Sequence, residues 1–246
     1  MSSAQQAEEP TAARGDYQKL SVIVPVYNER NTIAEVLRRI RAVSVPLEVE
    51  VIVVDDGSTD GTEKVLSALG DSTVRVITHD RNRGKGCAVR TGLESARGDL
   101  VIIQDADLEY DPEDWHRLLS PLFKGKSKVV YGSRFTGERK DMLPSHWVGN
   151  RFLALVTNVL YRSTLSDMET CYKLFDRSVL EGMELRARRF EFEPEITAKV
   201  LRRGHRIYEV PISYAGREPS EGKKITWRDG FQALATLLRY RFGPQP

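Results

Sequence analysis

Short apolar runs alternate with helical patterns in the first part of the chain. Residues 49–54 are rich in β-branched side chains and stop at a cluster of turn-forming and helix-capping residues at 55–61. Residues 20–29 are a second apolar run that enters a polar loop, and a helical pattern follows from Thr32 to Val43. Because strands that alternate with helices form βαβ units, the sequence predicts an α/β fold with a mainly parallel sheet. Ligands of such sheets bind beyond the carboxyl ends of the strands.

Carboxylates end the apolar run at residues 100–109. In an extended backbone, residues two apart point the same way, so Asp105, Asp107 and Glu109 are expected to present carboxylates from one edge. These carboxylates repel one another, and a divalent cation is the simplest partner that relieves the repulsion. Mg²⁺ takes one or two protein carboxylates and completes its shell with water and substrate phosphates. An ordinary acidic turn is the alternative, but a second acidic strand end at residues 55–56 favours a shared ligand site.

A basic, glycine-containing loop at residues 80–86 follows a short strand at residues 74–77 and opens a helix. Glycines beside a helix N-terminus let backbone amides approach a phosphate, and Arg83 and Lys85 add positive charge. A solvated loop is the alternative interpretation. The spacing matches neither the Walker nor the dinucleotide fingerprint, so the sequence favours neither a P-loop kinase nor an NAD-dependent dehydrogenase.

The length and the charge balance narrow the class of protein. A chain of 246 residues can bury one sizeable core, and α/β domains of this length commonly remain undivided. The 37 basic and 35 acidic residues leave a formal charge of +2, so we expect no nucleic-acid partner. Only two cysteines are present, Cys87 and Cys171, which argues against a disulfide scaffold and fits a reducing cytoplasm.

The two ends of the chain differ from its centre in composition. Residues 1–17 lack periodicity and are rich in Ala, Gln, Glu and Ser, so we expect a disordered tail before a single domain at residues 18–226. No apolar run approaches the roughly 18 residues that a membrane span needs, and the N-terminus lacks the apolar core of a signal peptide. From these features we expect a cytoplasmic protein.

Two stretches carry apolar residues at helical spacing. One spans residues 147–161, and the other spans residues 227–246, where apolar side chains are mixed with arginines. Basic amphipathic helices can lie on anionic membranes, whereas most amphipathic helices pack their apolar face on the core. The sequence therefore predicts a C-terminal amphipathic helix that packs on the domain or on a membrane surface. Our hypothesis is peripheral membrane association at the cytoplasmic face.

Four motifs, in chain order, resemble those of family 2 glycosyltransferases with the GT-A fold. They are VPVYNE at residues 24–29, VDDGSTD at 54–60, NRGKG at 82–86 and DAD at 105–107. Later stretches at residues 131–135, 167–175 and 217–224 are similar to the dolichyl- and polyprenyl-phosphate mannose synthase and glucosyltransferase branch. The resemblance covers most of the chain from Leu20 to about Trp227. It implies a Rossmann-like, mainly parallel sheet flanked by helices, a nucleotide-sugar donor, Mg²⁺ or Mn²⁺ as cofactor, and inversion at the anomeric carbon.

The resemblance assigns donor-binding residues to most of the predicted strand ends. Lys85 would contact the donor from the glycine loop. Asp105, Asp107 and Glu109 would face the metal and the diphosphate, and Asp107 would be catalytic. Glu109 stands where many polyprenyl-phosphate mannose synthases have glutamine, which places an extra negative charge there and makes it a less secure ligand. The nucleobase and ribose would be held by Pro25, Tyr27, Glu29 and Asp56. The basic loop that closes over the diphosphate would contain Arg217 with Lys223 or Lys224.

The acceptor site is implied by residues later in the chain. Arg134 and Arg151 resemble the arginines that bind the phosphate of a polyprenyl-phosphate acceptor, and the planar guanidinium suits two phosphate oxygens. A phosphate monoester is largely ionised near neutral pH, with a second pKa of about 6, so such an acceptor needs little or no general base. A sugar hydroxyl would need one, and Asp167 or Glu169 are then the candidates. Loop capping is the alternative role of these two carboxylates.

The resemblance implies a hexosyltransferase in which the acceptor phosphate attacks C1 of the sugar. GDP-mannose ranks slightly ahead of UDP-glucose as donor, on resemblance alone. A hydroxyl acceptor on a saccharide, lipid or protein is a second interpretation, and a non-catalytic nucleotide-sugar-binding or scaffold protein is an alternative of another class. The glycine-rich N-terminal pattern of a pyrophosphorylase is missing, which disfavours a nucleotidyltransferase. We interpret Glu191, Glu193 and Glu195 as the acidic first turn of a helix rather than as sugar ligands.

Overall fold

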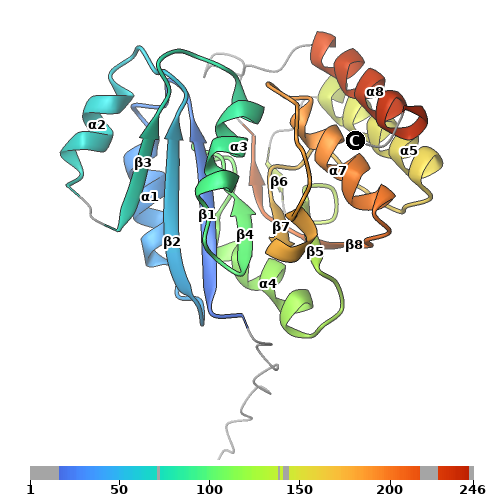
Figure 1. Cartoon of the computed structure of the whole chain (residues 1–246), viewed down its shortest axis with the longest axis horizontal. Helices are drawn as coiled ribbons and strands as arrows, with labels where there is room; N and C mark the ends of the chain where they lie inside the picture. The colour runs from blue at the N-terminus through green and yellow to red at the C-terminus, as the bar shows by residue number, and fades with distance from the viewer. Residues whose placement is uncertain (1–16, 71–72, 138, 141–143, 217–226, 244–246) are drawn as a thin grey trace, which may run out of the picture.

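A computed structural model describes residues 17–70, 73–137, 139–140, 144–216 and 227–243 of the chain (Figure 1). The predicted disordered tail lies outside these residues, apart from Tyr17. Within the described ranges, seven strands form one sheet in the order β3-β2-β1-β4-β7-β5-β8. The strands are β1 (Lys19–Val26), β2 (Glu48–Asp55), β3 (Val74–Thr78), β4 (Leu100–Ile103), β5 (Val129–Ser133), β7 (Lys173–Asp176) and β8 (Ile207–Pro211).

Most neighbouring strands run parallel. β1 pairs in parallel with β2 and β4, β2 with β3, and β5 with β8. β7 lies between β4 and β5 and is antiparallel to both. The predicted α/β class with a mainly parallel sheet is therefore confirmed, while the alternation of strands and helices did not predict the inserted antiparallel strand.

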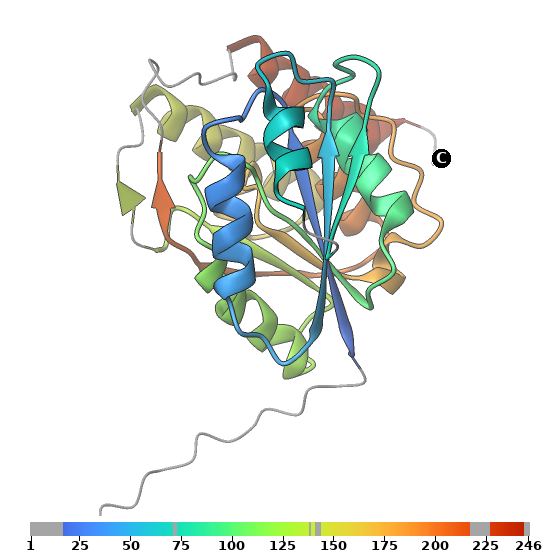
Figure 2. The same cartoon turned by 90° about the vertical axis from the view of Figure 1, so that its left-hand side faces the viewer.

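Helices cover both faces of this sheet (Figure 2). Val22 and Val24 of β1 pack in one cluster with Ile33 of α1 (Ile33–Ala42), which matches the predicted helix from Thr32 to Val43. Ile23 packs on the opposite face with Ala88 of α3 (Lys85–Ser95), because side chains alternate along a strand. Helices α2 (Thr62–Ala68) and α4 (Trp115–Phe123) and a 3₁₀ turn at Pro112–Asp114 complete the first half of the fold.

Three helices, α5, α7 and α8, lie together beside the second half of the sheet (Figure 1). Leu153 of α5 (Pro144–Tyr161), Ala198 of α7 (Phe192–Arg202) and Leu237 of α8 (Trp227–Phe242) share one buried apolar cluster. The short helix α6 (Arg177–Leu180) follows β7. No helix in the described part of the chain combines the length and the apolarity needed to cross a membrane.

The chain after β4 departs from the predicted extended backbone. β4 ends at Ile103, and the backbone then bends at residues 106–109, where Leu108 has a positive φ of 65°. The expectation that Asp105, Asp107 and Glu109 project from one extended edge was therefore wrong, because the two-residue alternation applies to extended backbone. Instead, this segment reaches a small sheet of β6 (Arg139–Lys140) and β9 (Tyr214–Ala215), which Tyr110 joins by a bridge to Tyr214.

Candidate functional site

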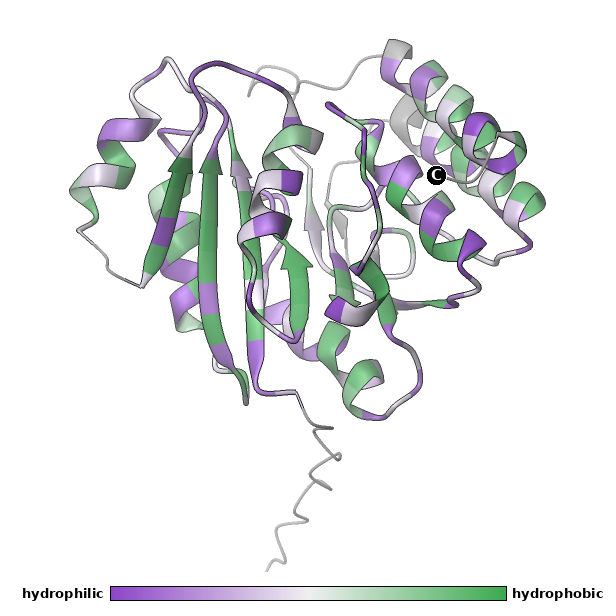
Figure 3. Ribbon diagram, in the orientation of Figure 1, coloured by the Kyte–Doolittle hydropathy of each residue, from purple (hydrophilic) through white to green (hydrophobic). Residues whose placement is uncertain are grey.

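The loops that follow β1 and β2 are hydrogen-bonded to each other. Asn28 has a left-handed backbone with φ 56°, a conformation that asparagine tolerates better than most residues. Its N–H donates to Ser58 Oγ at 2.9 Å, and its Oδ1 accepts the N–H of Thr59 at 2.8 Å. The two loops thus form one rim at the carboxyl edge of the sheet, where hydrophilic residues gather in Figure 3 and where ligands of such sheets bind.

Three of the predicted nucleoside-binding residues lie at this rim. Pro25 pairs in register with Val54 near the end of β1, and Tyr27 begins the loop with a partly exposed side chain. The Oε2 atom of Glu29 accepts the hydroxyl hydrogen of Thr32 at 2.9 Å, and the Glu29 carbonyl accepts the N–H of Thr32 at 3.1 Å. Glu29 therefore helps to start α1, and its contact with a nucleoside stays a prediction.

Asp56, the fourth predicted nucleoside ligand, is buried and already has protein partners. Its two oxygens accept the N–H of Arg83 at 2.9 and 3.1 Å and the N–H of Gly84 at 2.7 Å. His79 Nδ1 lies 2.7 Å from Asp56 Oδ1. The carboxylate thus ties the glycine loop to the end of β2, a role for which the sequence carries no local signal.

Lys85 connects the glycine loop to two carboxylates from distant parts of the chain. Its Nζ lies 2.9 Å from Asp105 Oδ1, just after β4, and 3.0 Å from Glu193 Oε1, in the first turn of α7. Burial lowers the pKa of an amine, but these two carboxylates together raise the pKa of Lys85 well above its ordinary value. Lys85 is therefore a fixed cation at the predicted donor site.

The carboxylates after β4 point to different partners. Asp105 contacts Lys85, Asp107 Oδ1 accepts the N–H of Glu109 at 3.2 Å, and Glu109 Oε2 accepts the hydroxyl hydrogen of Tyr214 at 2.9 Å. Within the described ranges, no three acidic, histidine or cysteine side chains form a group that would hold a metal ion. Two carboxylates still fit a cation such as Mg²⁺, which takes one or two from a protein and the rest from phosphate and water.

Arg134 and Asp167 form a buried ion pair beside the end of β5. Arg134 donates from Nε and Nη2 to the two carboxylate oxygens, both at 2.7 Å, and its N–H donates at 3.1 Å. Burial alone would lower the pKa of Arg134, but Asp167 raises it well above the ordinary value. Glu209 of β8 holds the backbone N–H of Asp167 at 3.0 Å, and the Arg134 guanidinium stacks 5.3 Å from the Tyr214 ring centre. The acceptor-site arginine that the sequence predicted is thus paired within the protein.

Arg151 differs from Arg134 because its side chain is exposed. It lies in α5 and donates from Nη1 to the carbonyl of Ser166 at 3.4 Å, next to Asp167. Its guanidinium also lies 5.7 Å from the ring centre of Phe135, the residue after Arg134. The fold therefore brings the two predicted phosphate-binding arginines to one region.

Two carboxylates between these charged groups have oxygens that are buried without a hydrogen-bond partner in the described part of the chain. They are Glu169 Oε1 and Glu193 Oε2. Burial, reinforced by the charge of Glu193, raises the pKa of Glu169 to about 8. Buried polar atoms nearly always have partners, so these two carboxyl groups are suited to form hydrogen bonds with a ligand. The sequence predicted that Glu193 opens a helix. Its contact with Lys85 distinguishes it from the neighbouring glutamates, and only the structure shows that contact.

Arg217, Lys223 and Lys224 lie outside the described residues. Their contact with the diphosphate stays a prediction from the sequence.

Comparison with known sequences gives a family match over most of the chain. The signature of "Glycosyl transferase family 2" matches residues 21–183. The chain is 30% identical over 223 residues to the low-salt glycan biosynthesis hexosyltransferase Agl6 of Haloferax volcanii, covering 89% of the chain and 53% of that protein. It is 30% identical over 242 residues to the dodecaprenyl-phosphate galacturonate synthase of Rhizobium johnstonii, covering 93% of the chain and 69% of that protein. The chain thus spans about half and about two thirds of these relatives.

Solved structures share the fold. Glucosyl-3-phosphoglycerate synthase of Mycobacterium tuberculosis, crystallised with Mn²⁺, UDP and glucosyl-3-phosphoglycerate, superposes with a TM-score of 0.73. The match covers 95% of the chain and 83% of that structure, at 23% sequence identity. At this identity, the likeness supports the architecture of the sheet and its helices.

Proposed function

The chain belongs to glycosyl transferase family 2, and from this premise we propose that it transfers a hexose from a nucleotide sugar to a polyprenyl phosphate with inversion at C1. The observation that carries the proposal is the arrangement of charge around the rim. Lys85, Asp105 and Glu193 meet just after β4, and Arg134 and Arg151 lie in one region beyond the end of β5. The names of the relatives, which include a dodecaprenyl-phosphate sugar synthase, favour a lipid phosphate as acceptor.

The donor side suits the diphosphate and the sugar of a nucleotide sugar. Lys85 supplies a positive charge beside the diphosphate, at the N-terminus of α3, where backbone N–H groups favour anions. The unpartnered oxygen of Glu193 would accept a hydrogen bond from a sugar hydroxyl, and the Glu169 carboxyl, largely protonated near neutral pH because its pKa is raised to about 8, would donate or accept one. GDP-mannose and UDP-glucose are the candidate donors, with GDP-mannose ranked first by resemblance.

The reaction we propose is a direct displacement. An oxygen of the acceptor phosphate forms a bond to the sugar C1 while the bond from C1 to the diphosphate oxygen breaks, and the nucleoside diphosphate leaves with the electron pair. Because the acceptor phosphate is already ionised near neutral pH, no side chain has to remove a proton. Arg151 and Arg134 would orient the phosphate.

A divalent cation fits the donor side as a cofactor. Asp105 and Asp107 would hold it together with the donor phosphates, because carboxylate oxygens are the ligands that Mg²⁺ and Mn²⁺ accept. The bound cation would act as a Lewis acid that stabilises the leaving diphosphate.

The proposal is tested by incubating the purified protein with Mg²⁺ or Mn²⁺, a short polyprenyl phosphate and a panel of GDP- and UDP-sugars. We expect metal-dependent release of nucleoside diphosphate and a glycosyl-phosphoryl lipid of matching mass, both abolished by EDTA. Donor binding without a lipid product would contradict the acceptor assignment. Transfer to a saccharide, lipid or protein hydroxyl would then support the second candidate, and no transfer to any acceptor would support a non-catalytic binding protein.

Replacing Arg151 by alanine is expected to weaken use of the lipid phosphate. The exposed guanidinium is available to a phosphate. Loss of one charge-assisted hydrogen bond should raise the KM for polyprenyl phosphate by about tenfold or more. The KM for the nucleotide sugar should stay unchanged. Arg97→Ala is the matched control, since Arg97 is an exposed arginine at the opposite edge of the sheet, just before β4. An equal loss of donor affinity would place Arg151 in the donor site instead.

An exposed apolar stripe on α5 supports contact with a membrane that carries the acceptor. Val148, Phe152, Leu155 and Val159 recur at helical spacing, and their exposures run from 52% to 72%. Apolar side chains of this size are ordinarily buried, and rows of them mark interaction surfaces. Exposed arginines on α5 and α8, among them Arg151, complement anionic lipid headgroups. We therefore assign this stripe to peripheral contact with the cytoplasmic face of a membrane.

The double substitution Phe152→Asp with Val159→Asp is expected to release the protein from lipid vesicles. Each apolar side chain that no longer inserts into the lipid lowers the partition coefficient of the protein onto vesicles by about tenfold or more. The added aspartates are also repelled by anionic lipid. Flotation with vesicles of anionic lipid and polyprenyl phosphate measures the bound fraction. Val76→Asp, at an exposed valine of the edge strand β3, is the control. A wild-type protein that stays in the soluble fraction under all conditions would refute membrane contact.

A further inference from the structure

A strap of backbone, residues 184–191, runs beside the glycine loop before it enters α7. The N–H of Cys87, in the first turn of α3, donates to the carbonyl of Arg188 at 3.1 Å. A Cβ atom on Gly84 would lie 2.4 Å from this carbonyl oxygen, and one on Gly86 would lie 2.7 Å from the carbonyl oxygen of Ala187. The strap thus forms one wall of the loop that carries Lys85, and a hydrogen bond joins the two backbones.

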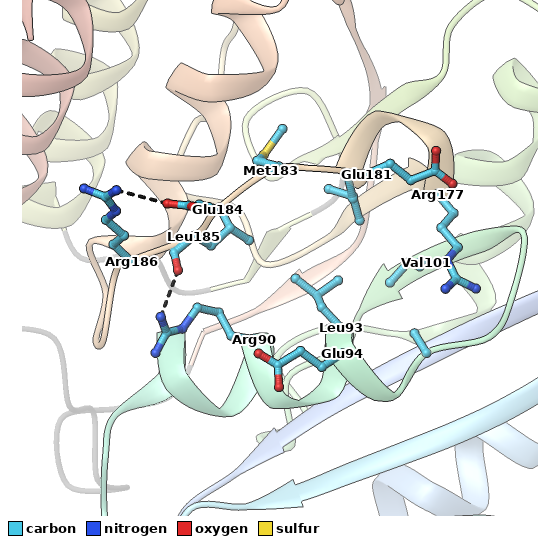
Figure 4. A pocket seen from close by; sticks show the side chains of 12 residues that line it. Arg90, Leu93, Glu94, Val101, Arg177, Glu181, Met183, Glu184, Leu185 and Arg186 are labelled. Carbon is cyan, nitrogen blue, oxygen red and sulfur yellow. Dashed lines mark hydrogen bonds and ion pairs between the residues drawn. The ribbon is translucent and has the colours of Figure 1, made fainter. Parts of the chain in front are cut away.

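The beginning of the strap packs on the core through Leu185 and Ala187 but leaves a space on the side that faces α3. A pocket of about 490 Å³ separates residues 181–186 from α3 (Figure 4). Arg90 Nη1 spans it with a hydrogen bond to the carbonyl of Leu185 at 2.8 Å, and Lys199 donates to the carbonyl of Glu184. Across this space, polar contacts join the strap to α3 and α7.

Glu195 of α7 makes the largest share of these polar contacts. Its side chain is completely buried, and it accepts the N–H of Arg186 at 2.9 Å and the N–H of Ala187 at 2.5 Å. It also contacts Lys199 Nζ at 2.7 Å and accepts the hydroxyl hydrogen of Tyr240, in α8, at 2.6 Å. One carboxylate therefore joins the strap to the C-terminal helix.

We infer that Glu195 and Tyr240 are positioning residues that set the donor loop through the strap. Tyr240 orients the Glu195 carboxylate, the carboxylate holds the N–H groups of Arg186 and Ala187, and the strap carbonyls place the N-terminus of α3 with Lys85. The orientation of the Glu195 carboxylate is thereby transmitted to the loop. The term donor loop for residues 80–86 rests on the proposed function. The link from Tyr240 through Glu195 and the strap to this loop does not depend on that function.

Hydrogen exchange of the ligand-free protein tests the link without any substrate. Tyr240→Phe removes one hydrogen bond to a charged group, and we expect the amides of Arg186, Ala187 and Cys87 to exchange about tenfold faster. Tyr161→Phe is the matched control. The hydroxyl of Tyr161 donates to the carbonyl of Leu237, in α8, at 2.6 Å, so this variant removes a hydrogen bond to α8 and keeps the one between Tyr240 and Glu195. The Cys87 amide should then exchange as in the wild type.

Two outcomes would overturn the inference. One is a Cys87 amide that exchanges equally in the wild type and in Tyr240→Phe. The other is an equal acceleration in both variants, which would show a general loosening of α8 and no path through Glu195. Glu195→Gln keeps the shape of the side chain and removes its charge, so it should act in the same direction as Tyr240→Phe and more strongly. Coupling along a path has to be measured in this way, because adjacency alone does not establish it.

A second readout connects the link to the donor. Calorimetric binding of UDP and GDP should be about tenfold weaker for Tyr240→Phe than for Tyr161→Phe, while the KM for polyprenyl phosphate is equal in the two variants. If Tyr240 has a purely structural role, Tyr240→Phe should lower the melting temperature but change nucleotide affinity and the KM for polyprenyl phosphate to the same extent. That result would contradict the inference. If the wild type transfers no sugar, the proposed function fails, and the exchange experiment still decides the link.

Discussion

Asp107→Asn is expected to lower kcat of sugar transfer by about a thousandfold while leaving the fold intact. The substitution keeps the shape of the side chain and removes the negative charge that would help to hold the cation at the leaving diphosphate. Loss of one group that stabilises transition-state charge costs about a hundredfold to a thousandfold. Asparagine can still accept the N–H of Glu109, so the local backbone should persist. The measurement is the initial rate of nucleoside diphosphate release at saturating donor and acceptor.

The control for this variant is Glu113→Gln. Glu113 lies a few residues later and its side chain is 66% exposed, so the variant loses the same charge at a solvated position. We expect its kcat to equal that of the wild type. The Asp107→Asn protein should also need a higher concentration of Mg²⁺ or Mn²⁺ for half-maximal rate. Unimpaired transfer by the folded variant would remove Asp107 from the catalytic role.

Asp167→Leu is expected to destabilise the protein by about 3–5 kcal/mol, because it leaves the buried Arg134 guanidinium without its partner. Arg134 then loses three hydrogen bonds to one carboxylate. For a domain of this size, the melting temperature should fall by about 10 °C. Urea denaturation and calorimetry measure the free energy of unfolding and the melting temperature.

The double variant Arg134→Met with Asp167→Leu separates stability from acceptor binding. Replacing a buried ion pair by apolar residues of similar volume is often neutral for stability, so most of the lost free energy should return. Use of polyprenyl phosphate should stay impaired if Arg134 contacts the acceptor. Normal lipid use by the double variant would limit Arg134 to a structural role. An unfolding free energy of Asp167→Leu within about 1 kcal/mol of the wild type would show that the pair is screened like a surface ion pair.

The sheet and its rim could be predicted because their signals are local in the sequence. β-Branched runs such as residues 49–54 select extended backbone, and the apolar spacing after Thr32 selects a helix, so the strands, α1 and the meeting of the loops followed from short segments. The ordered motifs predicted family 2 membership, and the family match confirms it. The backbone after β4 was mispredicted because nothing in the local sequence signals the positive φ of Leu108.

The partners of the charged side chains could not be predicted in the same way. Lys85 meets a carboxylate from α7, Arg134 meets Asp167, and the carboxylate of Glu109 meets the hydroxyl of Tyr214. Each pair joins residues far apart in the chain, and such distances depend on how the strands and helices pack. The antiparallel β7, which lies between β4 and β5, carries the segment before it to Arg134.

The sequence by itself determined which segments become strands and helices, which edge of the sheet collects the polar loops, and which family the chain belongs to. These properties follow from backbone preferences and from motifs that a short stretch of residues carries. The tertiary structure alone decided that Asp56 holds the glycine loop, that Arg134 is buried against Asp167, and that Glu195 joins α8 to the strap. The physical reason is that ion pairs and hydrogen bonds act over a few ångströms, and only the folded chain brings these side chains within that distance.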